Sequence, residues 1–167
     1  MSAGDKPKLE LQEFIPYQLS ILANTVSRAL ASHYTEEFDL TIAQWRIMAV
    51  LGRESGLSAN EVGRRTAMDK VSVSRAIAGM VRDKRVSQVD DPADGRRRRL
   101  RLTAAGRGVY RRIVPRALAF EHQLLGALGV RDRERLAGLL PGLQRAAEQV
   151  SVEFDGSGGS GGSGVGD

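Results

Sequence analysis

The sequence predicts a mainly α-helical protein with one small β wing, and three observations support this fold class. Apolar residues recur every three or four positions over most of the 167 residues, which is the period of a helix. The period becomes alternating only between Val86 and Leu102, on either side of a turn-rich Asp-Pro-Ala-Asp-Gly segment, as in a hairpin. The length is that of one domain, or of one domain with an oligomerisation arm.

The first helix is expected from Leu9 to about Phe38, entered near Pro16, because proline is favoured in the first turn of a helix. It would be amphipathic, with an apolar stripe formed by Leu19, Leu22, Val26 and Leu30.

Two capping boxes mark the next two helices. Thr41 is followed three residues later by Gln44, and Ser58 by Glu61, so each pair can satisfy the free amide groups at a helix start. The first box opens a helix that ends at Gly52 and carries an apolar stripe, made of Trp45, Met48, Ala49 and Leu51. The second opens a helix that runs to about Arg65.

A turn over Thr66 to Asp69 leads into a further helix, Lys70 to Lys84, in which Val73, Ile77, Met80 and Val81 are expected to face the core. Two short helices joined by so tight a turn form a helix-turn-helix, and the second one holds the recognition position.

The hairpin that follows is expected to carry Arg96, Arg97, Arg98 and Arg99 at its tip. Its carboxylates, Asp90, Asp91 and Asp94, could in principle hold magnesium. With Pro92 between them and four arginines adjacent, turn formation and charge pairing are the better interpretation.

Two long helices complete the chain. Thr103 is a plausible N-cap for a helix from Ala104 that Pro115 interrupts or kinks. A last helix from about Asp132 has a nearly seven-residue apolar repeat, and its apolar stripe is wide enough to need a partner. From Asp155 the Gly/Ser repeat is typical of a flexible linker or an expression scar.

Basic charge is concentrated in the middle of the chain. Of 25 basic and 20 acidic residues, sixteen basic and five acidic ones fall between Val62 and Arg116, a balance of +11 against −6 elsewhere. Such a block attracts polyanions such as nucleic acid. The plainer alternative is a solvated surface, since 21 of the basic residues are arginine.

Composition argues against several classes of function. The chain has no cysteine, which excludes disulfides, thiol catalysis and thiol redox sensing. Its two histidines, His33 and His122, lie on different predicted helices, so we expect no catalytic residues, no metal site, no cofactor and no enzyme activity. Without an apolar run of membrane-spanning length or a secretion signal, we expect no membrane association and a cytoplasmic, nucleoid-associated location.

Three segments carry a resemblance to a known family: DPADGRRRRLRLTAAG over residues 91–106, LTIAQWRIMAVL over 40–51 and LSANEVGRRTAMDKVSVSRAIAGM over 57–80. Together, across about Phe14 to Val150, the chain resembles the MarR family of winged helix-turn-helix transcriptional regulators. The resemblance implies an N-terminal dimerisation helix (1–38), a winged helix-turn-helix DNA-binding domain (39–103), C-terminal dimerisation helices (104–154) and a flexible tail (155–167). Two positions depart from the family pattern: Arg85 replaces a frequent glycine at the recognition-helix exit, and Gln88 replaces a basic residue.

The candidate DNA contacts on the recognition helix are Lys70, Ser72, Ser74 and Arg75. Arg75 and Ser72 rank first as base readers, because arginine binds guanine acceptors and serine can donate to bases. Capping by Asp69 and Ser72, and a bond from Ser74 back to its own helix, are the structural alternatives.

On the wing, Arg96 suits the negative potential of a minor groove. The resemblance implies that Asp94 orients Arg96. Arg97, Arg98 and Arg99 would then contact phosphates or remain solvated.

The resemblance also implies a small effector, often aromatic, between the dimer helices and the winged helix. Tyr17, His33, Trp45 and Arg46 could line its site, with Arg46 facing a carboxylate. The alternatives are a core role for Trp45, helix-end packing for Tyr34 and a structural ion pair for Arg46.

The sequence therefore predicts a ligand-responsive regulator that binds a pseudo-palindromic double-stranded DNA operator as a homodimer and is released by its effector. Repression is the expected output, as in most of the similar regulators. Two alternatives stay open: a non-specific nucleic-acid-binding or chromosome-organising protein, with a steep salt dependence and no sequence preference, and a winged-helix module that has lost operator recognition.

Overall fold

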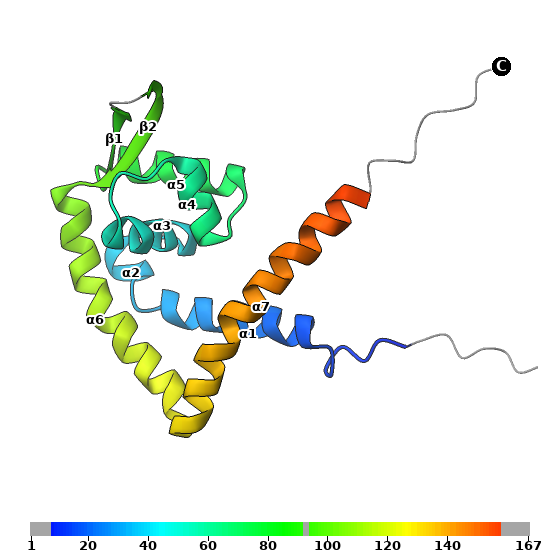
Figure 1. Ribbon diagram of the computed structural model, residues 1–167. Coiled ribbons are helices and arrows are strands. Elements are labelled where there is room, and N and C mark those ends of the chain that lie inside the picture. The colour runs from blue at the N-terminus through cyan, green and yellow to red at the C-terminus, as the bar shows by residue number, and fades with distance from the viewer. Residues whose placement is uncertain (1–7, 92–93, 158–167) are drawn as a thin grey trace, which may run out of the picture. The chain divides into compact units, whose positions relative to one another are not determined.

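The computed structural model describes residues 8–91 and 94–157, and the side chains of residues 8–91 and 98–152 (Figure 1). The described chain forms seven helices and one two-stranded antiparallel sheet: α1 Ile15–Ala31, α2 Thr35–Phe38, α3 Ile42–Arg53, α4 Ala59–Thr66, α5 Lys70–Arg82, β1 Val86–Asp91, β2 Asp94–Leu102, α6 Ala104–Gly126 and α7 Val130–Ser157. This confirms the predicted fold class. The chain divides into two compact units, Met1–Phe120 and Glu121–Asp167.

The prediction of a single first helix from Leu9 to Phe38 is wrong. Helix α1 spans Ile15–Ala31 with Pro16 in its first turn, and the chain turns before the short α2. The turn places Tyr34 and Phe38 in the core, where their side chains are 1% and 5% exposed. Burial of two aromatic rings outweighs the continuation of a helix whose own residues are all at least partly exposed.

Both predicted capping boxes are confirmed. At α3 the Thr41 amide donates to Gln44 Oε1 at 2.9 Å, and the Gln44 amide donates to Thr41 Oγ1 at 3.2 Å. At α4 the Ser58 amide donates to Glu61 Oε2 at 2.7 Å, and the Glu61 amide donates to Ser58 Oγ at 3.3 Å. These bonds fix where the two helices start.

The core lies among α3, α4, α5 and the hairpin, with contributions from α2 and the first half of α6. Helix α3 contacts α4, α5 and β2, and the most deeply buried side chains include Ile47, Met48, Val62, Met80, Leu100 and Ile113. The predicted inward faces of Val73, Ile77 and Met80 are confirmed, but Val81 is 38% exposed and its assignment to the core is wrong. At 100° per residue, Val81 lies about a quarter turn away from the centre of the buried stripe of α5.

The corner between α5 and β1 forms without glycine. Lys84 adopts the left-handed conformation at φ 53°, while the Arg85 amide donates to the Met80 carbonyl at 2.8 Å and the Lys84 amide to the Val81 carbonyl at 3.0 Å. This pair of bonds is a Schellman motif. The left-handed residue therefore precedes Arg85, whose guanidinium instead donates to the carbonyl oxygens of Phe38 and Asp39.

The paired strands of the hairpin extend further toward the turn than the sequence pattern indicates. Asp90 pairs with Arg98, Val89 with Arg99 and Val86 with Leu102. Arg98 and Arg99 therefore lie within β2 and not at the tip, which corrects the prediction. At the other end of the sheet, the Leu100 amide donates to the Leu57 carbonyl at 2.8 Å, tying the wing to the segment before α4.

Helix α6 starts where predicted, because Thr103 Oγ1 accepts from the Gly106 amide at 3.0 Å. The helix continues through Pro115 to Gly126, so of the predicted interruption or kink the interruption is wrong. Helix α7 likewise passes through Pro141 and extends to Ser157, into the segment expected to be a flexible tail; residues 158–167 of that tail lie outside the described chain. Within the described chain, no helix is both long and apolar enough to cross a bilayer.

Candidate DNA-binding surface

The turn between α4 and α5 is fixed by one left-handed residue and one cap. Ala67 has φ 50°, and Asp69 accepts from the Ser72 amide at 2.8 Å and from the Ser72 hydroxyl at 2.6 Å. These donors hold the pKa of Asp69 below its ordinary value. The structural alternative for Ser72 is therefore present: its hydroxyl proton is engaged in the cap of α5, and its lone pairs alone are left for other donors.

Burial divides α5 into two faces. The inner face consists of Val73, Ala76, Ile77 and Met80. At 100° per residue, the opposite face consists of Val71, Arg75, Ala78 and Arg82, and all four are exposed. Lys70 and Ser74, also exposed, lie on the flank between the two faces. Of the predicted contacts, Arg75 thus points most directly away from the core.

Val71 was missed by the sequence reasoning. It is 56% exposed, in the first turn of α5. The helical period could have identified it, because a valine two positions before Val73 lies on the side of the helix away from the buried stripe.

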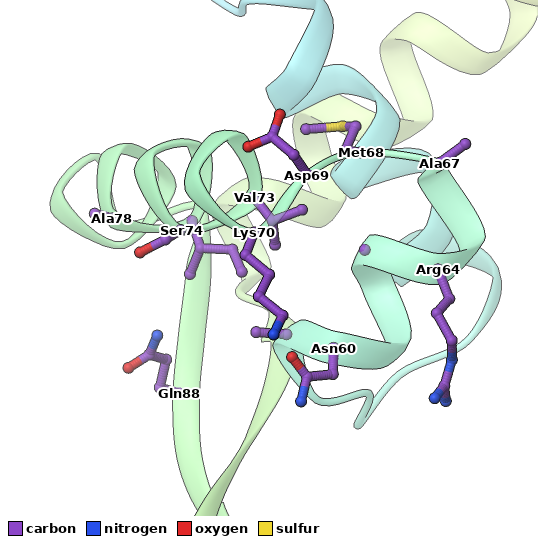
Figure 2. A pocket seen from close by; sticks show the side chains of 13 residues that line it. Asn60, Arg64, Ala67, Met68, Asp69, Lys70, Val73, Ser74, Ala78 and Gln88 are labelled. Carbon is purple, nitrogen blue, oxygen red and sulfur yellow. The ribbon is translucent and has the colours of Figure 1, made fainter. Parts of the chain in front are cut away.

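A hollow of about 750 Å³ separates α4 from α5 beside β1 (Figure 2). Asn60 and Arg64 of α4, Lys70 and Ser74 of α5, and Gln88 of β1 are among the residues that line it. Four of these five side chains can donate hydrogen bonds through nitrogen and the fifth through a hydroxyl. Such a rim suits the phosphate oxygens of a nucleic-acid backbone.

A second hollow, of about 670 Å³, lies where the start of α4 faces the wing, and Arg64, Arg98 and Arg99 line it. The two arginines of β2 differ in exposure because successive strand residues point to opposite faces. Arg98 is 66% exposed and lies 3.3 Å from Gln88 Oε1 and 3.9 Å from Asp90 Oδ1. It is available to an external anion.

Arg99 is held by partners within the fold, so the alternative that it remains solvated is wrong. Its Nε and Nη2 both lie 2.7 Å from Oδ2 of Asp91, which is 6% exposed. Its Nη1 donates to the Gly56 carbonyl at 3.0 Å and lies 3.7 Å from Glu61 Oε2. Arg99 thereby joins the wing to the start of α4, and we call this set, Arg99, Asp91, Gly56 and Glu61, the wing strut.

The remaining wing candidates, Asp94, Arg96 and Arg97, have side chains outside the described residues; their backbone belongs to β2. The magnesium interpretation gains no support from the described carboxylates, which form no cluster suited to a metal ion.

The candidate effector residues occupy different surroundings. Trp45 is 8% exposed and packs against Tyr34 and Tyr110, with ring centroids 5.5 and 6.3 Å away. Burial raises the pKa of Tyr34, partly offset by the positive charge of Arg46.

The other three lie nearer the surface. Arg46 Nη2 donates to Ser27 Oγ at 3.1 Å, the His33 ring lies 5.8 Å from that of Phe120, and Tyr17 is 41% exposed on α1. A third hollow, of about 290 Å³ between α3 and α6, is lined by other residues, among them Arg53, Arg107 and Tyr110.

A family model described as MarR family matches residues 38–97. The chain is 27% identical over 129 residues to the transcriptional activatory protein BadR of Rhodopseudomonas palustris, covering 75% of this chain and 73% of BadR.

Two solved structures resemble this one along nearly their whole length. A MarR/EmrR family transcriptional regulator from Acinetobacter sp. ADP1 has a TM-score of 0.78 at 26% identity, covering 84% of this chain and 99% of its own. The PcaV transcriptional regulator from Streptomyces coelicolor, in complex with its natural ligand, has a TM-score of 0.73 at 25% identity, covering 85% and 99%.

Proposed function

The chain belongs to the MarR family of transcriptional regulators, and from this premise we propose that it binds a pseudo-palindromic DNA operator, sequence-specifically, as a homodimer. One observation carries the proposal: the face of α5 opposite the core presents Val71, Arg75 and Ala78 to solvent, beside a hollow between α4 and α5 whose lining includes Arg64 and Lys70. A helix with such a face can enter a major groove.

In the proposed complex, Arg75 takes guanine acceptors and Lys70 and Ser74, on the flank, reach the adjacent phosphates. Ser72 contributes through its remaining acceptor capacity. The wing lies over the neighbouring minor groove, where Arg96, oriented by Asp94, enters the groove and Arg97 and Arg98 contact phosphates. The exposure of Arg98 supports its part in this arrangement.

Dimerisation through the arms is supported by apolar surface that the single chain leaves uncovered. Leu19 and Leu22 of α1 are 37% and 55% exposed, and on α7 the exposed leucines are Leu136, Leu139, Leu140 and Leu143. Apolar faces of this extent are typical of an interface. We assign residues 1–38 and 104–154 to dimerisation and 39–103 to DNA binding, so that two-fold symmetry of the protein matches that of the operator.

Control by a small, aromatic effector is the second part of the proposal. The similar PcaV structure holds its natural ligand, which supports ligand control here. Tyr17, His33, Trp45 and Arg46 remain the candidate residues; the buried Trp45 would form the wall of such a site, and Arg46 would face a carboxylate. An effector that favours the geometry unable to span two half-sites releases the DNA by population shift.

The output depends on where the operator lies relative to the promoter. We propose repression, as expected for a dimer that covers a promoter; the relative BadR is named as an activatory protein, so a promoter-reporter assay with and without the gene measures the sign directly. Higher reporter activity in the deletion strain supports repression, and lower activity means activation.

A gel-shift titration at fixed salt tests the DNA-binding proposal. The wild-type protein is expected to bind a duplex from its own gene's promoter region far more tightly than a random duplex, and Arg96→Ala to weaken that binding by about 1–3 kcal/mol with an unchanged circular dichroism spectrum. Equal affinity for both duplexes would instead favour the non-specific alternative. Equal affinity of wild type and Arg96→Ala would mean that Arg96 of the wing does not contact the DNA.

A further inference from the structure

Val71 is a large exposed apolar side chain on a face of α5 whose other members are Arg75, Ala78 and Arg82. It is 56% exposed in the first turn of α5, with Lys70 before it and Arg75 one turn later on the same outward face. The fold does not explain the residue, because valine adds nothing to the core from this face and is a poorer helix former than alanine.

The chemistry of a major groove offers one apolar group to such a side chain. Each base pair presents hydrogen-bond donors and acceptors there, and only thymine adds a methyl group, at C5. A valine that faced phosphates or purine edges would be desolvated without gain, whereas contact with a thymine methyl removes apolar surface of both partners from water.

We propose that Val71 is a specificity-determining residue that reads a thymine 5-methyl group in each half-site of the operator. This inference rests on the proposed function, since it requires α5 to lie in the major groove. Val71 and Arg75 are four residues apart, or about 6 Å along the helix. The thymine read by Val71 therefore lies about two base pairs from the guanine read by Arg75, at about 3.4 Å per base pair.

The neighbouring side chains fit this assignment. Ala78, one turn beyond Arg75 on the same face, is short and leaves room for the helix to approach the base edges. Arg75 and Arg82 on this face, with Lys70 on its flank, give the surface a positive charge that attracts DNA and orients it there. Val71 then supplies discrimination at one position, while the charged groups supply most of the affinity.

The experiment isolates a single methyl group. The full-length protein first selects its preferred site from randomised duplexes; each thymine of that site is then replaced singly by deoxyuridine, which lacks only the 5-methyl group. Affinities are measured by fluorescence anisotropy at fixed salt for wild type, Val71→Ala and Val81→Ala. Val81→Ala is the matched control, because it truncates an exposed valine of the same helix that lies off the outward face and at its far end.

For wild type and Val81→Ala, a single deoxyuridine at the thymine that Val71 contacts, in either half-site, is expected to weaken binding about fourfold, the value of one buried methyl-sized group. Val71→Ala is expected to bind the thymine and deoxyuridine duplexes equally well. The inference is overturned if Val71→Ala keeps the wild-type preference for thymine, or if no thymine is methyl-sensitive in the wild type. Failure of the selection to enrich any sequence would overturn the proposed function itself, and this inference with it.

Discussion

Arg98 and Arg99 are adjacent arginines for which the structure predicts opposite consequences of the same substitution. Arg99 makes three contacts of the wing strut, to Asp91, the Gly56 carbonyl and Glu61. Hydrogen bonds that involve a charged group contribute about 1.5–3 kcal/mol each when buried. Because the Arg99 side chain is 34% exposed, water replaces some of these hydrogen bonds when the side chain is truncated. We therefore expect Arg99→Ala to lower the free energy of unfolding by about 2 kcal/mol in total.

That loss corresponds to a fall of about 4–8 °C in Tm for a chain of this length, at fixed protein concentration. Arg98→Ala removes a side chain that is 66% exposed and only loosely held, so its Tm is expected to change by no more than about 2 °C.

Salt dependence of DNA binding separates the two roles. If Arg98 contacts a phosphate in each protomer, Arg98→Ala reduces the slope of log K against log salt by about two for the dimer, whereas Arg99→Ala leaves the slope unchanged. The measurements are differential scanning fluorimetry and anisotropy titrations at four salt concentrations. An Arg99→Ala protein with wild-type Tm and a reduced slope would refute the wing strut.

Three further predictions concern the stability of the fold. A Cβ at Gly106 would lie 2.0 Å from the Arg85 carbonyl oxygen, so Gly106→Ala is expected to lose at least about 2–3 kcal/mol in urea unfolding, whereas Gly108→Ala, with nothing within 4 Å, should gain up to about 1 kcal/mol. Lys84→Gly relieves a left-handed φ of 53° and should gain about 0.5–1 kcal/mol in the same assay, the conformational cost removed less the chain entropy added; a loss would contradict the assigned corner. Four of the described carboxyls have a pKa held below the ordinary value by hydrogen bonds from arginine or serine: Glu37, Glu54, Glu61 and Asp69. They stabilise the fold above the unfolded pKa of about 4, and this contribution is lost as pH falls through the lower folded pKa. Tm should therefore be steady from about pH 7 to 5 and fall below about pH 4.

Elements with local signals were predictable from the sequence. The starts of α3, α4 and α6 coincide with Thr41, Ser58 and Thr103 because each hydroxyl satisfies an amide in its own first turn. The recognition position of α5 followed in the same way from the short turn before it.

Features that depend on distant partners were not predictable. The break after α1 exists because Tyr34 packs against Trp45, eleven residues away, and the role of Arg99 depends on Gly56 and Asp91, which no local pattern connects to it. Pro115 also predicted an interruption or kink, yet α6 continues through it.

Sequence-specific DNA binding is tested most directly by one ratio: the affinity of the wild-type protein for its selected duplex divided by its affinity for a scrambled duplex of equal length, measured by anisotropy at physiological salt. We predict a ratio of about 10³ or more, as for specific DNA-binding proteins. A ratio near one would mean that the basic surface holds only phosphates, and would contradict the reading role assigned to α5.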